Sequence, residues 1–89
     1  MTREQRIEEM LANAHPKALR LEPKTTFDRA IMGLTGDGRI VYSESQIIVA
    51  LQDVDNMEYE EALEFYEYNT SRGVQYAGKY APIIITQEP

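Results

Sequence analysis

The chain has 89 residues, a formal net charge of −6 and no cysteine. A chain of this length encloses one hydrophobic core, so we expect a single domain over residues 1–89. The lack of cysteine excludes disulfides and thiolate metal ligands. The longest aliphatic run, residues 47–51, is far shorter than the roughly 20 residues of a membrane span. The N-terminal segment MTREQRIEEM lacks the apolar stretch of a signal peptide, so we expect a cytoplasmic protein that does not bind membranes.

The first helix is predicted from a capping pattern and from hydrophobic spacing. Thr2 and Gln5 match the capping box, in which each side chain bonds to the backbone of the other residue at the start of a helix. Helical spacing then follows at Ile7, Met10, Leu11 and Ala14. Because proline disfavours helical geometry in the residue before it, this helix is predicted to end at His15, before Pro16.

Two strands are predicted next, over residues 27–34 and 39–42. Between them, Thr35-Gly36-Asp37-Gly38 supplies glycines for a tight hairpin turn. These glycines do not make a phosphate-binding loop, because the GxGxxG and GxxxxGK spacings are absent and a strand follows instead of a helix.

The second half of the chain is predicted to hold two helices and a last strand. Ser43 and Gln46 form another capping pattern, and helical spacing follows it. A third helix is expected over about residues 58–69, a loop over residues 72–81 and a β-branched strand over residues 83–86. The order α-β-β-α-α-β predicts an α+β fold. We expect a small, mostly antiparallel sheet of about three strands with helices packed on one face.

The apolar faces of these elements predict the hydrophobic core. We expect largely buried side chains at Ile7, Leu11, Ile31, Ile40, Ile47, Leu51, Leu63, Tyr66 and Ile84. Tyr59 shares the apolar side of the third helix and is also expected in the core.

The negative charge of the chain is concentrated around the third helix. Residues 40–71 hold eight carboxylates and no lysine or arginine, whereas residues 1–39 hold seven basic and six acidic residues. On a helical wheel, one arc opposite the apolar side carries Glu60, Glu61, Glu64 and Glu67, with Tyr68 among them. Such a field repels duplex nucleic acid and attracts basic protein surfaces. This arc is either a solvated surface or a partner-binding face, with Tyr68 as an aromatic contact.

The best candidate for small-molecule binding is the segment 71–80. Arg72, Tyr76, Lys79 and Tyr80 alternate there with glycines, and such side chains are suited to stacking on a base and holding a phosphate. The alternative is a connecting loop whose tyrosines cover the edge of the core.

The sequence predicts no catalytic residue, no cofactor and no metal site. Residues 53–64 space their carboxylates as an EF-hand does, but Met57 stands where an oxygen ligand belongs and Glu58 where glycine is required. His15 is the single histidine, and no serine lies in a GxSxG motif. We therefore expect that the protein is not an enzyme.

Several segments resemble a group of small phage and prophage proteins of unknown function. The resembling residues are 59–69 (YEEALEFYEYN), the following Tyr80-Ala-Pro82-Ile-Ile, and the hairpin that ends at Ile40-Val41-Tyr42. The resemblance covers about residues 27–86. Members commonly carry threonine before the third helix, in an M-T-x-E-E-A pattern, where this chain has Glu58. The resemblance implies a phage accessory setting and brings no catalytic signature.

These observations predict a small acidic, phage-type accessory protein that binds a host or phage protein with a basic surface through its acidic helix. Two alternatives stay open at this point. One is a protein that binds or sequesters small nucleotides through residues 71–80. The other is a structural, homo-oligomeric accessory protein whose tyrosines form the subunit interface.

Overall fold

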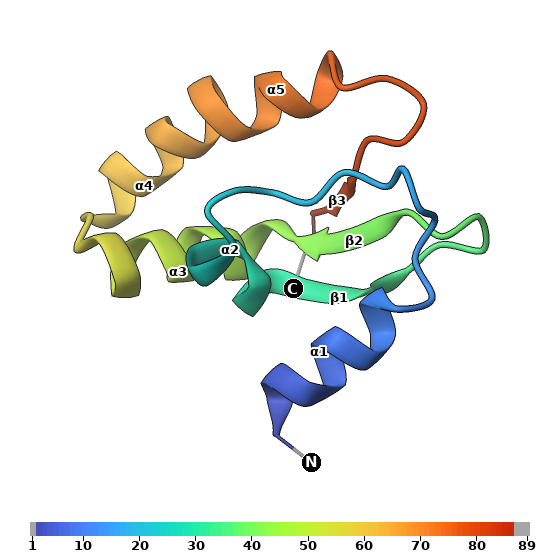
Figure 1. The fold of residues 1–89 in the computed structure, drawn as a ribbon. Coiled ribbons are helices and arrows are strands. Elements are labelled where there is room, and N and C mark those ends of the chain that lie inside the picture. Colours follow the sequence, from blue (N-terminus) through green and yellow to red (C-terminus); the bar gives the residue numbers. More distant parts are fainter. Residues whose placement is uncertain (1, 87–89) are drawn as a thin grey trace.

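The computed structural model describes residues 2–86 and has the predicted α+β fold (Figure 1). In chain order its elements are α1 (Arg3–Leu11), α2 (Lys24–Phe27), the 3-10 helix η1 (Asp28–Ala30), β1 (Ile31–Leu34), β2 (Ile40–Ser43), α3 (Glu44–Asp55), α4 (Tyr59–Phe65), the π-helix η2 (Tyr66–Ser71), α5 (Arg72–Gln75) and β3 (Ile83–Ile85). In Figure 1, α1 lies next to the β1 edge of the sheet. The run from α4 to α5 lies beyond the β3 edge, above the segment that joins α1 to α2.

Helix α1 begins as predicted but ends four residues earlier. The Oγ1 of Thr2 accepts a hydrogen bond from the backbone of Gln5 at 3.1 Å, and the backbone of Thr2 donates to the Gln5 side chain at 2.8 Å. The capping box is therefore confirmed. The helix ends at Leu11, because the backbone N–H of His15 donates to the carbonyl of Gly38 at 2.9 Å. A tertiary hydrogen bond thus places His15 in a turn, not at the helix end.

The predicted hairpin is present, with a shorter first strand. β1 and β2 pair antiparallel, Ile31 opposite Tyr42, and Gly38 ends the turn with φ of 84°. The prediction of a strand from residue 27 is wrong, because Phe27 belongs to α2 and η1 follows it. β2 ends at Ser43, where α3 begins, so it does not extend far enough to pair with a strand from residue 27.

The sheet is mixed rather than mostly antiparallel. The strand order is β1-β2-β3, and β3 runs parallel to β2 with Ile84 beside Tyr42. A parallel neighbour requires a crossover that returns the chain to the starting end of the sheet. Helices α3 to α5 provide that crossover between Ser43 and Ile83.

The sheet has one buried face, as predicted for a sheet with helices packed on one face. Successive residues of a strand point to opposite faces. Tyr42 is fully buried at the centre of the sheet, between the buried Ile31 on β1 and the half-buried Ile84 on β3. Met32 and Ile85 point the other way and are exposed.

The third predicted helix continues beyond its expected end. α4, η2 and α5 follow one another without a break from Tyr59 to Gln75. The predicted loop at 72–81 is therefore wrong over its first four residues. Gly73 weakens a helix by about 1 kcal/mol relative to alanine but does not by itself end one.

Most of the predicted core is confirmed. Buried side chains are found at Ile7, Ile31, Ile40, Ile47, Leu51 and Tyr66, and half-buried ones at Leu11, Leu63 and Ile84. The prediction for Tyr59 is wrong, because this side chain is 58% exposed. A helical wheel shows which way a side chain points, but not whether another element extends far enough to cover it.

Candidate protein-binding surface

The acidic face is the surface formed by Glu60, Glu61, Glu64, Glu67 and Tyr68. All five side chains are exposed, and they lie on α4 and the start of η2. Opposite them, Ala62 and Tyr66 are buried against the rest of the protein. Within residues 2–86, none of the four carboxylates forms an ion pair. The four carboxylates therefore face solvent without an ion-pair partner in the described residues.

Two parts of the acidic face differ in what they contribute to folding. Glu60 and Glu61 lie in the first turn of α4, where negative charge stabilises a helix by about 0.3–1 kcal/mol through the helix dipole. Glu64 and Glu67 lie beyond this turn, and like charges three or four residues apart repel each other. Helix stability therefore accounts for Glu60 and Glu61, but not for Glu64 and Glu67.

Aromatic rings accompany the carboxylates. Tyr68 is 59% exposed, and the guanidinium carbon of Arg72 lies 5.3 Å from the centre of its ring. Phe65 lies three residues earlier on the same helical run and is 38% exposed. Exposed aromatic side chains of this kind supply the apolar contact area that carboxylates lack.

The candidate ligand residues of the segment 71–80 make contacts in different places. Arg72 stacks over Tyr68, and Tyr76 is 86% exposed at the end of α5. The Lys79 ammonium lies 5.7 Å from the ring centre of its neighbour Tyr80. Tyr80 itself stacks on the ring of His15, with 4.4 Å between the ring centres. The contacts of Arg72 and Tyr80 thus point to different parts of the molecule.

An apolar groove of about 340 Å³ lies beside the helical run that carries the acidic face. One wall is formed by the run from α4 to α5, and the other by residues 19–23. In Figure 1 the run from α4 to α5 passes over the segment that joins α1 to α2. Its apolar lining includes Leu19, Leu21, Phe27, Leu51, Phe65 and Val74. Because Phe65 lines the groove and precedes Tyr68 by one helical turn, it connects the groove with the part of the acidic face at Tyr68.

The helical wall of the groove is held by a buried tyrosine. The hydroxyl of Tyr66 donates a hydrogen bond to the Glu44 carboxylate at 2.9 Å, which ties η2 to the start of α3. Burial of the ring raises the pKa of the Tyr66 hydroxyl, and the hydrogen bond to the carboxylate raises it further. The tyrosine therefore stays protonated and keeps this hydrogen bond at neutral pH.

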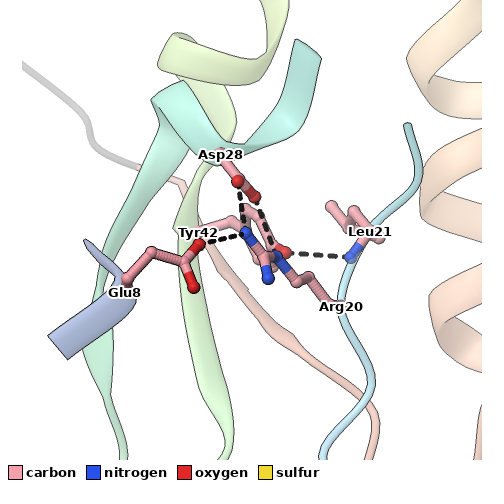
Figure 2. Close-up of polar contacts among 5 residues, drawn as sticks. All are labelled: Glu8, Arg20, Leu21, Asp28 and Tyr42. Atoms are coloured by element: carbon pink, nitrogen blue, oxygen red, sulfur yellow. Dashed lines mark hydrogen bonds and ion pairs between the residues drawn. The ribbon is translucent and has the colours of Figure 1, made fainter. Parts of the chain in front are cut away.

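The opposite wall is held by polar contacts that Figure 2 shows. The guanidinium of Arg20 forms a two-pronged contact with Asp28, with Nε 3.0 Å from Oδ1, and its Nη2 lies 3.4 Å from the Glu8 carboxylate. The next residue, Leu21, donates its backbone N–H to the Tyr42 hydroxyl at 2.9 Å. Both walls are therefore held by polar contacts within the protein itself.

The described part of the chain has neither a cluster of metal-ligating side chains nor a membrane-spanning helix. Among residues 2–86, no group of three or more His, Asp or Glu side chains lies close enough together to hold a metal ion. No helix in this range has the length and apolar character needed to cross a membrane.

The sequence did not reveal the groove, although it did reveal the acidic face. Helical spacing identifies the exposed carboxylates of one helix, but the groove combines α3, the run from α4 to α5 and the segment at 19–23. The one available signal was Phe65, which flanks the apolar side of the third helix on the wheel. Comparison with known proteins adds nothing to this geometry, because no family model, no curated protein and no solved structure matches the chain.

Proposed function

We propose that the protein is a small accessory protein that binds a host or phage protein through its acidic face. The observation that carries this proposal is the pair Glu64 and Glu67 beside the exposed Tyr68. The two carboxylates have no ion-pair partner within residues 2–86 and do not stabilise the helix. A surface of one charge attracts a partner of the opposite charge and speeds its association.

The partner expected from this chemistry is a protein with a basic surface. The carboxylates act over a distance and orient the partner, whereas Tyr68 and Phe65 make apolar contact once it has docked. The resemblance to small phage proteins and the absence of cysteine support a phage accessory role in the cytoplasm of a host cell.

Affinity capture with charge-reversed variants tests the proposal. The variant carries Glu64→Lys with Glu67→Lys, and the matched control carries Glu4→Lys with Glu9→Lys on the exposed surface of α1. Each double change adds four units of charge, from −6 to −2, so the two proteins have the same formal net charge. Captured host proteins are identified by mass spectrometry at low and high salt.

The expected result is a basic protein that binds the parent and the control but not the Glu64/Glu67 variant. Its association with the parent should slow at high salt, because ions screen charges more than about 10 Å apart at 0.1 M. Equal capture by both double variants would show that the acidic face is only a solvated surface.

A second candidate function is homo-oligomerisation through the open face of the sheet. Met32 and Ile85 are exposed there, and Val41 and Ile83 are only half-buried. An apolar sheet face in contact with water is suited to packing against a second copy of itself. A mass from light scattering that rises with concentration, and that Met32→Lys abolishes, would support this function; a constant monomer mass would exclude it.

A further inference from the structure

We infer that the apolar groove binds the apolar side chains of a basic amphipathic helix supplied by the partner. This inference rests on the proposed function and adds the kind of element that docks. Phe65 lines the groove one helical turn from Tyr68, so a partner helix in the groove would lie next to the Tyr68 end of the acidic face.

The size and lining of the groove suit side chains rather than a nucleotide. Its volume of about 340 Å³ is near the lower limit of the roughly 300–1,000 Å³ found for small-molecule sites. Its walls are largely aliphatic and aromatic, with Leu19 and Phe65 both partly open to solvent. Apolar side chains of a partner gain about 25 cal/mol for each Å² removed from water in such a groove.

The backbone at the groove favours a helix over an added strand. Strand addition requires an edge with unpaired backbone groups. One wall is helical, and in the other wall the N–H groups of Leu19 and Leu21 already donate to the Tyr80 carbonyl and the Tyr42 hydroxyl. An amphipathic helix instead docks through side chains spaced at i, i+3, i+4 and i+7.

The charges around the groove select basic residues on that helix. Glu22 and Asp55 are both exposed and line the groove. Arg20 is the one basic residue in its lining, and Asp28 and Glu8 already pair with it. Lysine or arginine flanking the apolar stripe of the partner helix would meet Glu22 and Asp55.

Gly73 keeps the groove open. It lines the groove within α5, where glycine is less stable than alanine by about 1 kcal/mol. Neither a positive φ nor a neighbour requires glycine there, because an added Cβ would have nothing within 4 Å. A glycine that the fold does not need leaves room for a partner side chain to approach the backbone.

A synthetic peptide provides the test. The probe has about 18 residues, enough for about five helical turns, with leucines at i, i+4, i+7 and i+11 and lysines on both flanks. One control peptide replaces the leucines with serine, and the other replaces the lysines with glutamate. Affinity is measured by fluorescence anisotropy with the full-length protein, and the bound site is located by NMR shifts of the Leu19, Leu21 and Val74 methyl groups.

Protein variants show whether the peptide enters the groove. Gly73→Leu places a side chain in the free space, and Gln75→Leu adds the same side chain to α5 outside the lining of the groove. Phe65→Ser is a second variant, which removes part of a wall and should keep the fold because Phe65 is partly exposed and lies outside the buried core. Gly73→Leu and Phe65→Ser should each weaken the basic leucine peptide about tenfold or more, whereas Gln75→Leu should not.

The outcomes separate this inference from the proposed function. The groove is not the docking site if the serine peptide binds as tightly as the leucine peptide. The same conclusion follows if Gly73→Leu and Phe65→Ser both leave the affinity unchanged. In either case the proposal for the acidic face is unaffected. If the glutamate peptide binds as tightly as the lysine peptide, the charge argument fails for both surfaces. No binding of the basic leucine peptide at about 1 mM would overturn the groove inference, while affinity capture still tests the acidic face.

Discussion

The hydroxyl of Tyr42 lies 2.9 Å from the backbone nitrogen of Leu21 and accepts its hydrogen bond (Figure 2). Tyr42 is fully buried on the central strand, and Leu21 belongs to a wall of the apolar groove. One hydrogen bond thus connects the centre of the sheet with a segment that has no regular secondary structure. Without the Tyr42 hydroxyl, the backbone N–H of the half-buried Leu21 would have no hydrogen-bond acceptor.

Tyr42→Phe should lower the free energy of unfolding by about 1–3 kcal/mol, the cost of a buried donor left without an acceptor. Urea denaturation followed by circular dichroism measures the change. Tyr76→Phe is the control, because it removes the same hydroxyl from a side chain that is 86% exposed. Equal stability of the two variants would contradict the role given to the hydrogen bond between Tyr42 and Leu21.

Stability should fall as the pH rises above 10. Burial raises the pKa of Tyr42 from 10.0 to about 12. Between these values the unfolded Tyr42 has lost its proton while the folded one keeps it, so Tyr42 alone lowers the free energy of unfolding by about 1.4 kcal/mol for each pH unit. The raised pKa of Tyr66 adds to this slope. Urea denaturation at pH 8, 10 and 11 measures this slope, and Tyr42→Phe should reduce it. A free energy of unfolding that stays constant over this range would contradict the burial of Tyr42.

Arg20→Met should destabilise the protein by about 1–3 kcal/mol, because it leaves the Asp28 carboxylate without its charged partner. The Arg20 and Asp28 side chains are only 19% and 25% exposed, so water does not fully replace the contact. Arg29→Met is the control, since Arg29 and Asp53 form a 3.7 Å ion pair with both side chains mostly in solvent. Thermal denaturation should show at most a change of about 0.5 kcal/mol for the control.

Gly38→Ala should cost more than Gly36→Ala, although both glycines lie in the same turn. Gly38 has φ of 84°, and a Cβ there would lie 2.5 Å from the backbone nitrogen of His15. A Cβ at Gly36 would meet nothing within 4 Å. The expected loss at Gly38 is about 1–3 kcal/mol, measured by chemical denaturation. Equal free energies of unfolding for the two variants would contradict the close approach of His15 to Gly38.

Leu51→Ala should destabilise the protein by about 2–5 kcal/mol, the range for a fully enclosed leucine. Leu51 is almost completely buried in α3. Leu63→Ala should cost less, because Leu63 on α4 is half-buried and its truncation leaves a space that water can enter. Urea titrations of the two variants compare the losses directly, and an equal loss would place α4 deeper in the core than the structure does.

Local patterns in the sequence were sufficient for the features that depend on neighbouring residues. The Thr2 capping box, the turn at Gly38 and the exposed stripe around Glu64 follow from spacing along the chain, and the structure has all three. Capping, positive φ and helical period act within a few residues, so they do not require knowledge of the fold.

Only the tertiary structure decided the features that depend on distant segments. His15 leaves α1 because Gly38 accepts its N–H, and β3 lies parallel to β2 because the intervening helices return the chain to the same end of the sheet. The apolar groove combines residues from Leu19 to Pro82, which no spacing rule relates. A side chain's direction follows from local geometry, but its burial and its partners depend on which other segment occupies the space beside it.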